Sequence, residues 1–189
     1  QAHSGIEFEL AAQVHPMVRL DVGVGLGNWT YTSDAEGTYR DGDSDVSFGY
    51  ALDGLFVGDM PQRNLVLGFT LTPVEGATIQ AIYKYYDKHI ADWNISSREY
   101  DPAVGHNMFS EIWQAPSYAI LDLHATYDLP FELGPAKPQV FFHMFNALDE
   151  VYIQDAVHIS SYNSWDKFTP FADDAEVFFG PPMSFNLGL

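Results

Sequence analysis

The sequence predicts an all-β fold, specifically an antiparallel transmembrane β-barrel segment of about seven strands. Three observations predict it. Apolar and polar residues alternate with a period of two in stretch after stretch. Short turns alternate with long polar loops between these stretches, as in outer-membrane barrels. Charged residues lie on the polar side of several strands, where a dry protein core would penalise each unpaired charge heavily.

Composition narrows the alternatives. The chain has 189 residues, no Cys, and 26 Asp and Glu against 8 Lys and Arg, which gives a formal net charge of -18. This charge argues against a nucleic-acid partner, and the lack of Cys excludes disulfides and thiolate metal sites. No window approaches the roughly 18 uninterrupted apolar residues that a spanning helix needs. A soluble all-β binding domain, with the apolar sides facing a protein core, remains the alternative fold.

The first predicted strand pair covers residues 5–14 and 18–31. Its first strand places Phe8 and Leu10 on one side and Glu7 and Glu9 on the other. Its second strand repeats this division, with Asp21 among glycines on the polar side, and ends in aromatic residues that suit an interfacial belt. We therefore expect a tight hairpin with one apolar and one ionised face.

Two further strand pairs follow, over residues 65–71 and 79–88 and then 119–128 and 139–144. Asp122 and Asp128 again lie on the polar side of the third pair. In the last of these strands Phe141 and Phe145 fall on the nominally polar side. The pattern indicates that the apolar side of every strand faces lipid and that the polar side faces a wet lumen.

The terminal strand covers residues 183–189, in which Met183, Phe185, Leu187 and Leu189 alternate with small polar residues. Pro181 and Pro182 precede it, and neither can donate a ladder hydrogen bond. Regular strand pairing is therefore expected to begin after these two prolines.

The predicted strand count is odd, whereas single-chain bacterial barrels have even numbers of antiparallel strands. With seven strands, residue 1 lies on the external side if the short turns are periplasmic. We therefore expect the chain to be the carboxy-terminal part of a larger barrel.

Several segments together resemble a known family. These are LDGLFVGDMPQRNLVLGFTLTP (52–73), YKYYDKHIADW (83–93), APSYAILDLHATYDLP (115–130), VFFHMFNALDEVYIQDA (140–156) and VFFGPPMSFNLGL (177–189). In this order they resemble the last strands of TonB-dependent outer-membrane receptors. The resemblance implies that residues 1–189 form the last third of a 22-stranded barrel in the Gram-negative cell outer membrane. Residues 1–189 differ from the family pattern in two respects, because they contain neither the plug domain nor the usual terminal aromatic residue.

The same resemblance implies a function. Such receptors actively import a scarce nutrient, such as a siderophore, a vitamin or an oligosaccharide, and a plug couples the barrel to the TonB complex. The expected partners are outer-membrane lipid and lipopolysaccharide, the TonB complex through the plug, and a small-molecule or oligosaccharide substrate. The alternative function is a barrel that serves as a surface scaffold for a lipoprotein or another subunit.

Three long loops, over residues 32–63, 92–116 and 148–176, carry most of the acidic residues. They are either a solvated surface, on which divalent cations bridge to lipopolysaccharide, or an attractant for cationic or metal-bearing ligands. In the first loop Asp41, Asp43 and Asp45 have the spacing of hard oxygen ligands for Ca²⁺. A plain polar loop accounts for them equally, because the EF-hand glycine and glutamate are replaced by Val46 and Leu52.

Aromatic and histidine side chains of the loops are candidates for an external ligand cup, in which rings stack on sugars or catechols. Loop packing is the alternative role for them. The candidates are Tyr100, His106, Trp113, His158, Tyr162 and Trp165.

The sequence does not predict an enzyme. His124 and Asp122 share one face of a strand, but no spacing ties a serine to them, and residues of a polar lumen wall account for both. No HExxH motif indicates a zinc site, and no cofactor other than the possible calcium ion is expected.

Overall fold

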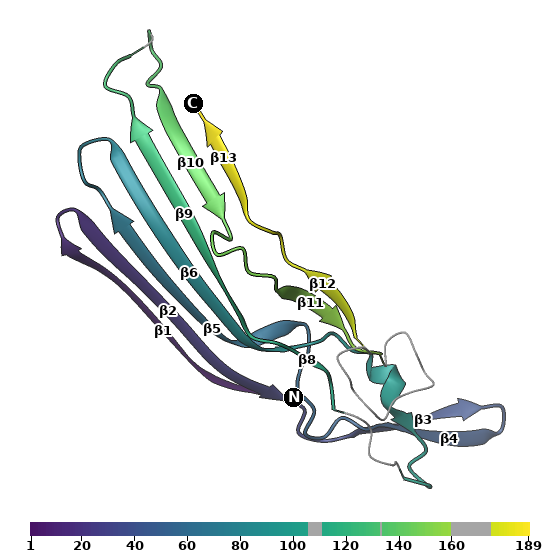
Figure 1. Ribbon diagram of the computed structural model, residues 1–189. Helices are drawn as coiled ribbons and strands as arrows, with labels where there is room; N and C mark the ends of the chain where they lie inside the picture. Colours follow the sequence, from purple (N-terminus) through teal and green to yellow (C-terminus); the bar gives the residue numbers. More distant parts are fainter. Residues whose placement is uncertain (106–110, 133, 160–174) are drawn as a thin grey trace.

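The computed structural model describes residues 1–105, 111–132, 134–159 and 175–189. One antiparallel sheet has eight strands, and we call the seven that follow one another in its main path the wall (Figure 1). In spatial order they are β1 (Ala2–His15), β2 (Val18–Thr30), β5 (Met60–Leu71), β6 (Ala77–Ile90), β9 (Tyr118–Asp128), β10 (Gln139–Phe145) and β13 (Ser184–Gly188). The eighth, the two-residue strand β8 (Gln114–Ala115), pairs with the end of β6. Among the described residues, no helix is long and apolar enough to cross a membrane.

The short and long connections lie at opposite ends of the wall (Figure 1). The turns between β1 and β2, β5 and β6, and β9 and β10 gather at one end, and the three long loops gather at the other. Gly76 shows why one turn needs glycine, since its φ is +80° and an added Cβ would lie 3.2 Å from the Asp128 backbone oxygen. The predicted alternation of turns and loops is confirmed.

The strand registers join the apolar sides of all seven strands into one continuous apolar face. Phe8 lies opposite Val24, Val24 opposite Leu65, and Leu65 opposite Tyr85. At the other edge of the wall, Phe142 lies opposite Leu187. These apolar residues do not meet in a closed interior, because Ile6 and Leu187 are 70% and 71% exposed.

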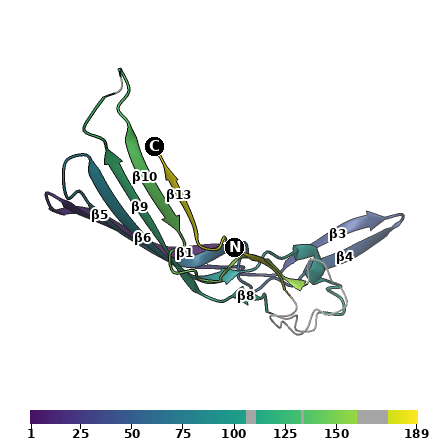
Figure 2. The same ribbon diagram turned by 45° about the horizontal axis from the view of Figure 1, so that its top comes forward.

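The long loops fold beyond one end of the wall into a region that we call the loop head (Figure 1). It contains β3 (Ala35–Asp41), β4 (Ser44–Tyr50), the 3-10 helix η1 (Ile95–Arg98), β7 (Glu99–Tyr100), β8 (Gln114–Ala115), β11 (Ile153–Val157) and β12 (Glu176–Phe179). Its buried apolar core consists of Leu52, Ile90, Ala91, Trp93, Ile112, Trp113, Ala115 and Ala156. The β3–β4 hairpin projects from the loop head as a separate arm (Figure 2).

The structure corrects the first predicted loop, residues 32–63, in two places. Residues 35–50 form the β3–β4 hairpin, and β5 begins at Met60 rather than near Leu65. The sequence does not reveal these segments because both lie beyond the apolar face, where no lipid requires alternation. Gln62 anchors the early part of β5, since its side chain accepts from the Trp29 N–H at 3.0 Å.

The terminal segment divides at its prolines. β12 pairs with β11 in the loop head, whereas β13 pairs with β10 in the wall. Pro181 and Pro182 lie between them, so regular pairing within the wall begins after the prolines, as predicted.

Candidate functional site

The polar face of the wall carries a continuous row of polar side chains, one from each strand. Direct register pairs connect them across the whole sheet, so they lie at one level near the turn end. We call this row the polar band. It consists of Gln13, Arg19, Thr70, Gln80, His124, His143 and Asn186.

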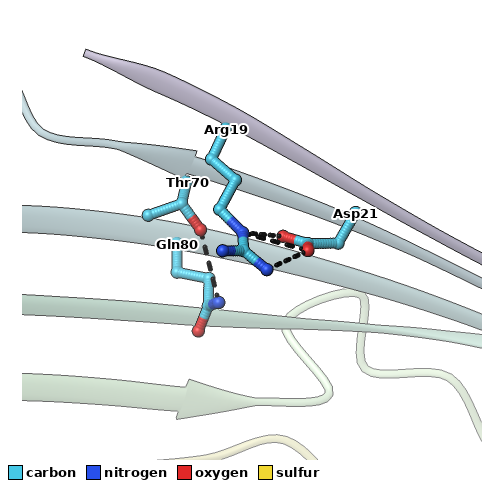
Figure 3. Close-up of polar contacts among 4 residues, drawn as sticks. All are labelled: Arg19, Asp21, Thr70 and Gln80. Atoms are coloured by element: carbon cyan, nitrogen blue, oxygen red, sulfur yellow. Dashed lines mark hydrogen bonds and ion pairs between the residues drawn. The ribbon is translucent and has the colours of Figure 1, made fainter. Parts of the chain in front are cut away.

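Contacts within and beside the band hold its side chains on the polar face. The Arg19 guanidinium donates to both carboxylate oxygens of Asp21, with the shortest N–O distance 2.7 Å (Figure 3). The Gln80 side-chain amide donates to the Thr70 hydroxyl at 3.4 Å. Such a row of donors and acceptors can hydrogen-bond a polar solute or a protein segment that lies against it.

One ion pair on this face is shielded from solvent. Lys84 Nζ lies 2.7 Å from an Asp122 carboxylate oxygen, and the Asp122 side chain is only 7% exposed. The Asn146 backbone N–H donates to the other Asp122 oxygen at 3.0 Å. These two donors satisfy a carboxylate that would otherwise be costly to bury.

A stack of tyrosines marks the place where the wall meets the loop head. The ring centroids of Tyr86 and Tyr118 are 5.2 Å apart, and those of Tyr118 and Tyr152 are 4.4 Å apart. Tyr152 comes from the third long loop, and its burial raises the pKa of its hydroxyl. The stack therefore ties this loop to β6 and β9 through aromatic contact.

A hollow of about 840 Å³ lies along β1, β2 and β5. Its lining includes Glu7, Glu9, Gly23, Gly25 and Asn64. A Cβ on Gly25 would lie 2.7 Å from the Asn64 amide nitrogen, so glycine leaves room there for the Asn64 side chain. The carboxylates beside this hollow favour cationic over anionic groups.

The predicted calcium ligands lie at the tip of the β3–β4 hairpin. Asp41 pairs with Ser44 and Asp45 with Arg40, which places the two aspartates on opposite faces of the hairpin. Asp43 lies in the two-residue turn beside Gly42, whose φ is +60°. Within the described ranges, no three His, Cys, Asp or Glu side chains form a group able to hold a metal ion. A calcium site at this tip stays a prediction.

The ligand-cup candidates lie in different surroundings. Trp113 and His158 are 8% and 1% exposed within the loop head. Their burial agrees with a role in loop packing rather than in a ligand cup. Tyr100 lies on β7, where its hydroxyl donates to a Glu36 carboxylate oxygen at 3.0 Å. Tyr100 is half-buried, and its partial burial together with the Glu36 carboxylate raises the pKa of its hydroxyl to about 12. The remaining candidates, His106, Tyr162 and Trp165, lie outside the described residues.

Sequence reasoning missed the tyrosine stack and the partner of His124. Tyr86 and Tyr118 lie on the polar side of their strands, where alternation predicts no aromatic residue, and the contact of Tyr152 from a loop has no periodic signal. His143 lies opposite His124 in the β9–β10 ladder. The length of the turn between the two strands was the one signal for this register, and that turn is long enough to allow several registers.

The comparisons with known proteins agree with this two-faced wall. A family profile described as TonB dependent receptor-like, beta-barrel matches residues 1–147. No curated protein matches the chain. The matched range contains six of the seven wall strands in full and the Lys84–Asp122 pair. The chain belongs to the TonB-dependent receptor β-barrel family, whose members are transport receptors of the outer membrane.

Proposed function

We propose that this chain is the carboxy-terminal part of a 22-stranded barrel that imports a neutral or cationic small substrate, with energy coupled through TonB. The observation that carries the proposal is the two-faced wall. Its apolar face is exposed, and its opposite face carries the polar band across all seven strands. A wall of this kind separates acyl chains from an aqueous lumen.

The open edges of the wall support the larger barrel. In the described residues, β1 pairs only with β2, and β13 pairs only with β10. Strand edges in a bilayer leave backbone N–H and C=O groups without hydrogen bonds, at a cost of several kcal/mol each. Further strands of the same barrel would pair with both edges and remove this cost.

Charge supports the choice of substrate. The chain has a net charge of -18, and the carboxylates of Glu7 and Glu9 line the hollow on the polar face. A lumen of this sign raises the local concentration of cations and lowers that of anions. Siderophores, vitamins and oligosaccharides that are neutral or cationic, including metal-bearing complexes, therefore fit the lumen better than polyanions of the same size.

Uptake by cells that carry the complete receptor tests this function. Labelled candidate substrates of matched size but different charge are compared in cells with and without TonB. We expect uptake that requires TonB and that is fastest for neutral or cationic substrates. Uptake that is independent of TonB, or a preference for anions, would contradict the proposal. Stable recovery of the barrel with a surface lipoprotein and no uptake would support the scaffold alternative.

A basic pair on the apolar side suits the lipopolysaccharide that we also propose as a partner. Arg63 lies opposite Leu26 in the ladder, at the loop end of the apolar face, and is paired with Asp87 at 3.4 Å. Lys88 Nζ donates to the Asn28 amide oxygen at 2.8 Å. Because Asp87 offsets one of the two cations, the group has a net positive charge of one, which attracts lipid phosphate at the level of outer-leaflet headgroups. Loss of copurified lipopolysaccharide in the double variant Arg63→Gln and Lys88→Gln checks this contact, and unchanged lipid content would refute it.

A further inference from the structure

Two histidines of the polar band face each other with their ring nitrogens in contact. His124 on β9 lies directly opposite His143 on β10, and their Nδ1 atoms are 2.8 Å apart. Both side chains are half-buried on the polar face. In a hydrogen bond between two neutral imidazoles, one Nδ1 carries the proton and the other offers its lone pair. The contact therefore brings two potential metal ligands to one point.

We propose that His124 and His143 form a binding site for a divalent transition-metal ion, with copper(II) as the best fit. Imidazole nitrogen is a ligand that Cu²⁺, Ni²⁺ and Zn²⁺ prefer, and Cu²⁺ binds such sites most tightly. Two nitrogens each about 2.0 Å from an ion and at right angles to each other lie about 2.8 Å apart. The observed Nδ1 separation matches this arrangement, in which the two rings occupy neighbouring corners of a square-planar site.

Two phenylalanines flank the histidine pair. The Phe141 ring stacks on His143 with centroids 5.2 Å apart, and Phe145 meets His124 edge-on at 5.5 Å. These contacts restrict how far the imidazoles can turn, which favours a preformed pair of ligands. They also give a physical role to the two phenylalanines that interrupt the polar side of β10.

The side chains around the histidine pair do not supply further metal ligands, so small molecules must occupy the remaining coordination positions of the ion. Asp122 shares the face of His124, but its oxygens are held by Lys84 and by the Asn146 N–H. Gln80 and Asn186 flank the pair in the ladders and supply neutral amides at the same level. The described residues contain no third His, Cys, Asp or Glu in a metal-binding group with this pair. Water or a chelator that arrives with the ion must complete the coordination.

Binding requires no net loss of protons. The Nδ1 proton shared by the two rings moves through water to the Nε2 atom of its own ring, so that both neutral imidazoles offer a lone pair to the ion. A site with two protein ligands releases its ion more readily than a closed site with four. A role for this site during import rests on the proposed function, whereas metal binding itself does not.

Copper titration of the complete receptor in detergent tests the site, with electron paramagnetic resonance as the readout. We expect one Cu²⁺ ion per chain with hyperfine coupling to two imidazole nitrogens. His124→Gln and His143→Gln should each weaken its binding by at least about tenfold. His3→Gln is the matched control, because His3 also lies in an aromatic contact, with Trp29, but has no histidine partner there. The signal should survive in this control.

A second measurement uses the unaltered protein and therefore does not depend on the folding of a variant. Diethyl pyrocarbonate modifies accessible imidazole nitrogens, and mass spectrometry locates the modified residues. Cu²⁺ should protect His124 and His143 severalfold, while Mg²⁺ should protect neither. Equal modification with and without Cu²⁺, or a two-nitrogen copper signal that persists in both glutamine variants, would overturn the site. Neither result would alter uptake that requires TonB, so the failure of this site is distinguishable from failure of the proposed function.

Discussion

The wall and the loop head use apolar residues in opposite ways. In the wall, Phe8 and Leu67 remain 53% and 41% exposed, because every strand turns its apolar side away from the protein. In the loop head, Ile90 and Trp113 are 1% and 8% exposed and pack in a closed core. Both regions belong to one continuous chain, and β6 extends from the wall into the loop head, where it contributes Ile90 to the core.

This difference shows which solvent each region requires. Among the described residues, no layer of protein covers the apolar face of the wall, so acyl chains supply the contacts that side chains supply in a soluble core. The loop head has to exclude water by its own packing, as a soluble domain does. Changes of the same chemical kind should therefore have different consequences in the two regions.

Removal of a large side chain should have the largest effect in the loop head. Trp113→Ala should destabilise the loop head by about 3–5 kcal/mol, because it leaves a cavity in a packed core. Phe8→Ala should cost no more than about 2 kcal/mol, because lipid can fill the space. Hydrogen exchange measures the difference when it is followed in both regions, at the wall amides of β1 and β2 and at the Ala91 N–H that donates to Trp113 O at 2.9 Å. Equal costs at the two sites would refute the contrast.

Two adjacent residues of β5 sharpen the contrast within the wall. Leu67 lies on the apolar face, and its neighbour Val66 lies on the polar face opposite Lys84. Leu67→Lys should destabilise the barrel by about 2–4 kcal/mol if it places the charge near the bilayer midplane. Val66→Lys should cost less than about 1 kcal/mol beyond its repulsion from Lys84, because its charge reaches water. Denaturant unfolding in bilayers measures the destabilisation by each substitution. A larger cost for Val66→Lys than for Leu67→Lys would contradict the assignment of the apolar face to lipid.

The smallest expected effect is a loss of stability at high pH, where the Tyr100–Glu36 contact between the arm and the rest of the loop head is weakened. The pKa of Tyr100 is raised to about 12, so its contact with Glu36 stabilises the fold fully below the ordinary tyrosine pKa of about 10. The stabilisation should disappear as the pH rises from about 10 to about 12 and the phenolate forms next to the carboxylate. Ultraviolet titration should show one late-titrating tyrosine fewer in Tyr100→Phe than in the unaltered chain. Loss of a tyrosine that titrates near pH 10 instead would exclude this contact.

The sequence was sufficient to predict the wall and its two faces. Alternation with a period of two fixes which side of each strand is apolar, and the short turns fix which strands are neighbours. The predicted start of pairing after Pro181 and Pro182 holds for the wall, because the loss of a backbone donor is visible in the sequence. It does not hold for the loop head, where β12 pairs with β11 ahead of the two prolines. These are local properties of the chain.

The candidate site was harder to predict because it depends on contacts between distant segments. Lys84 and Asp122 are both visible as charges on polar faces, but their pairing depends on the register of β6 against β9. Trp113 and His158 look like ligand-cup residues because loops are normally exposed, and the folded loop head buries both. Alternation and turn length carry no information on how long loops pack against each other.

Asn146 connects the third long loop to the interior of the wall. Its backbone is in the left-handed region with φ +49°, its N–H donates to Asp122, and its side-chain amide donates to the carbonyls of Glu150 and Pro181. One asparagine thus clamps both the departure and the return of this loop beside the Lys84 ion pair. A movement of this loop therefore acts on the buried ion pair through Asn146, in addition to acting on β9 through the ring contact of Tyr152 with Tyr118.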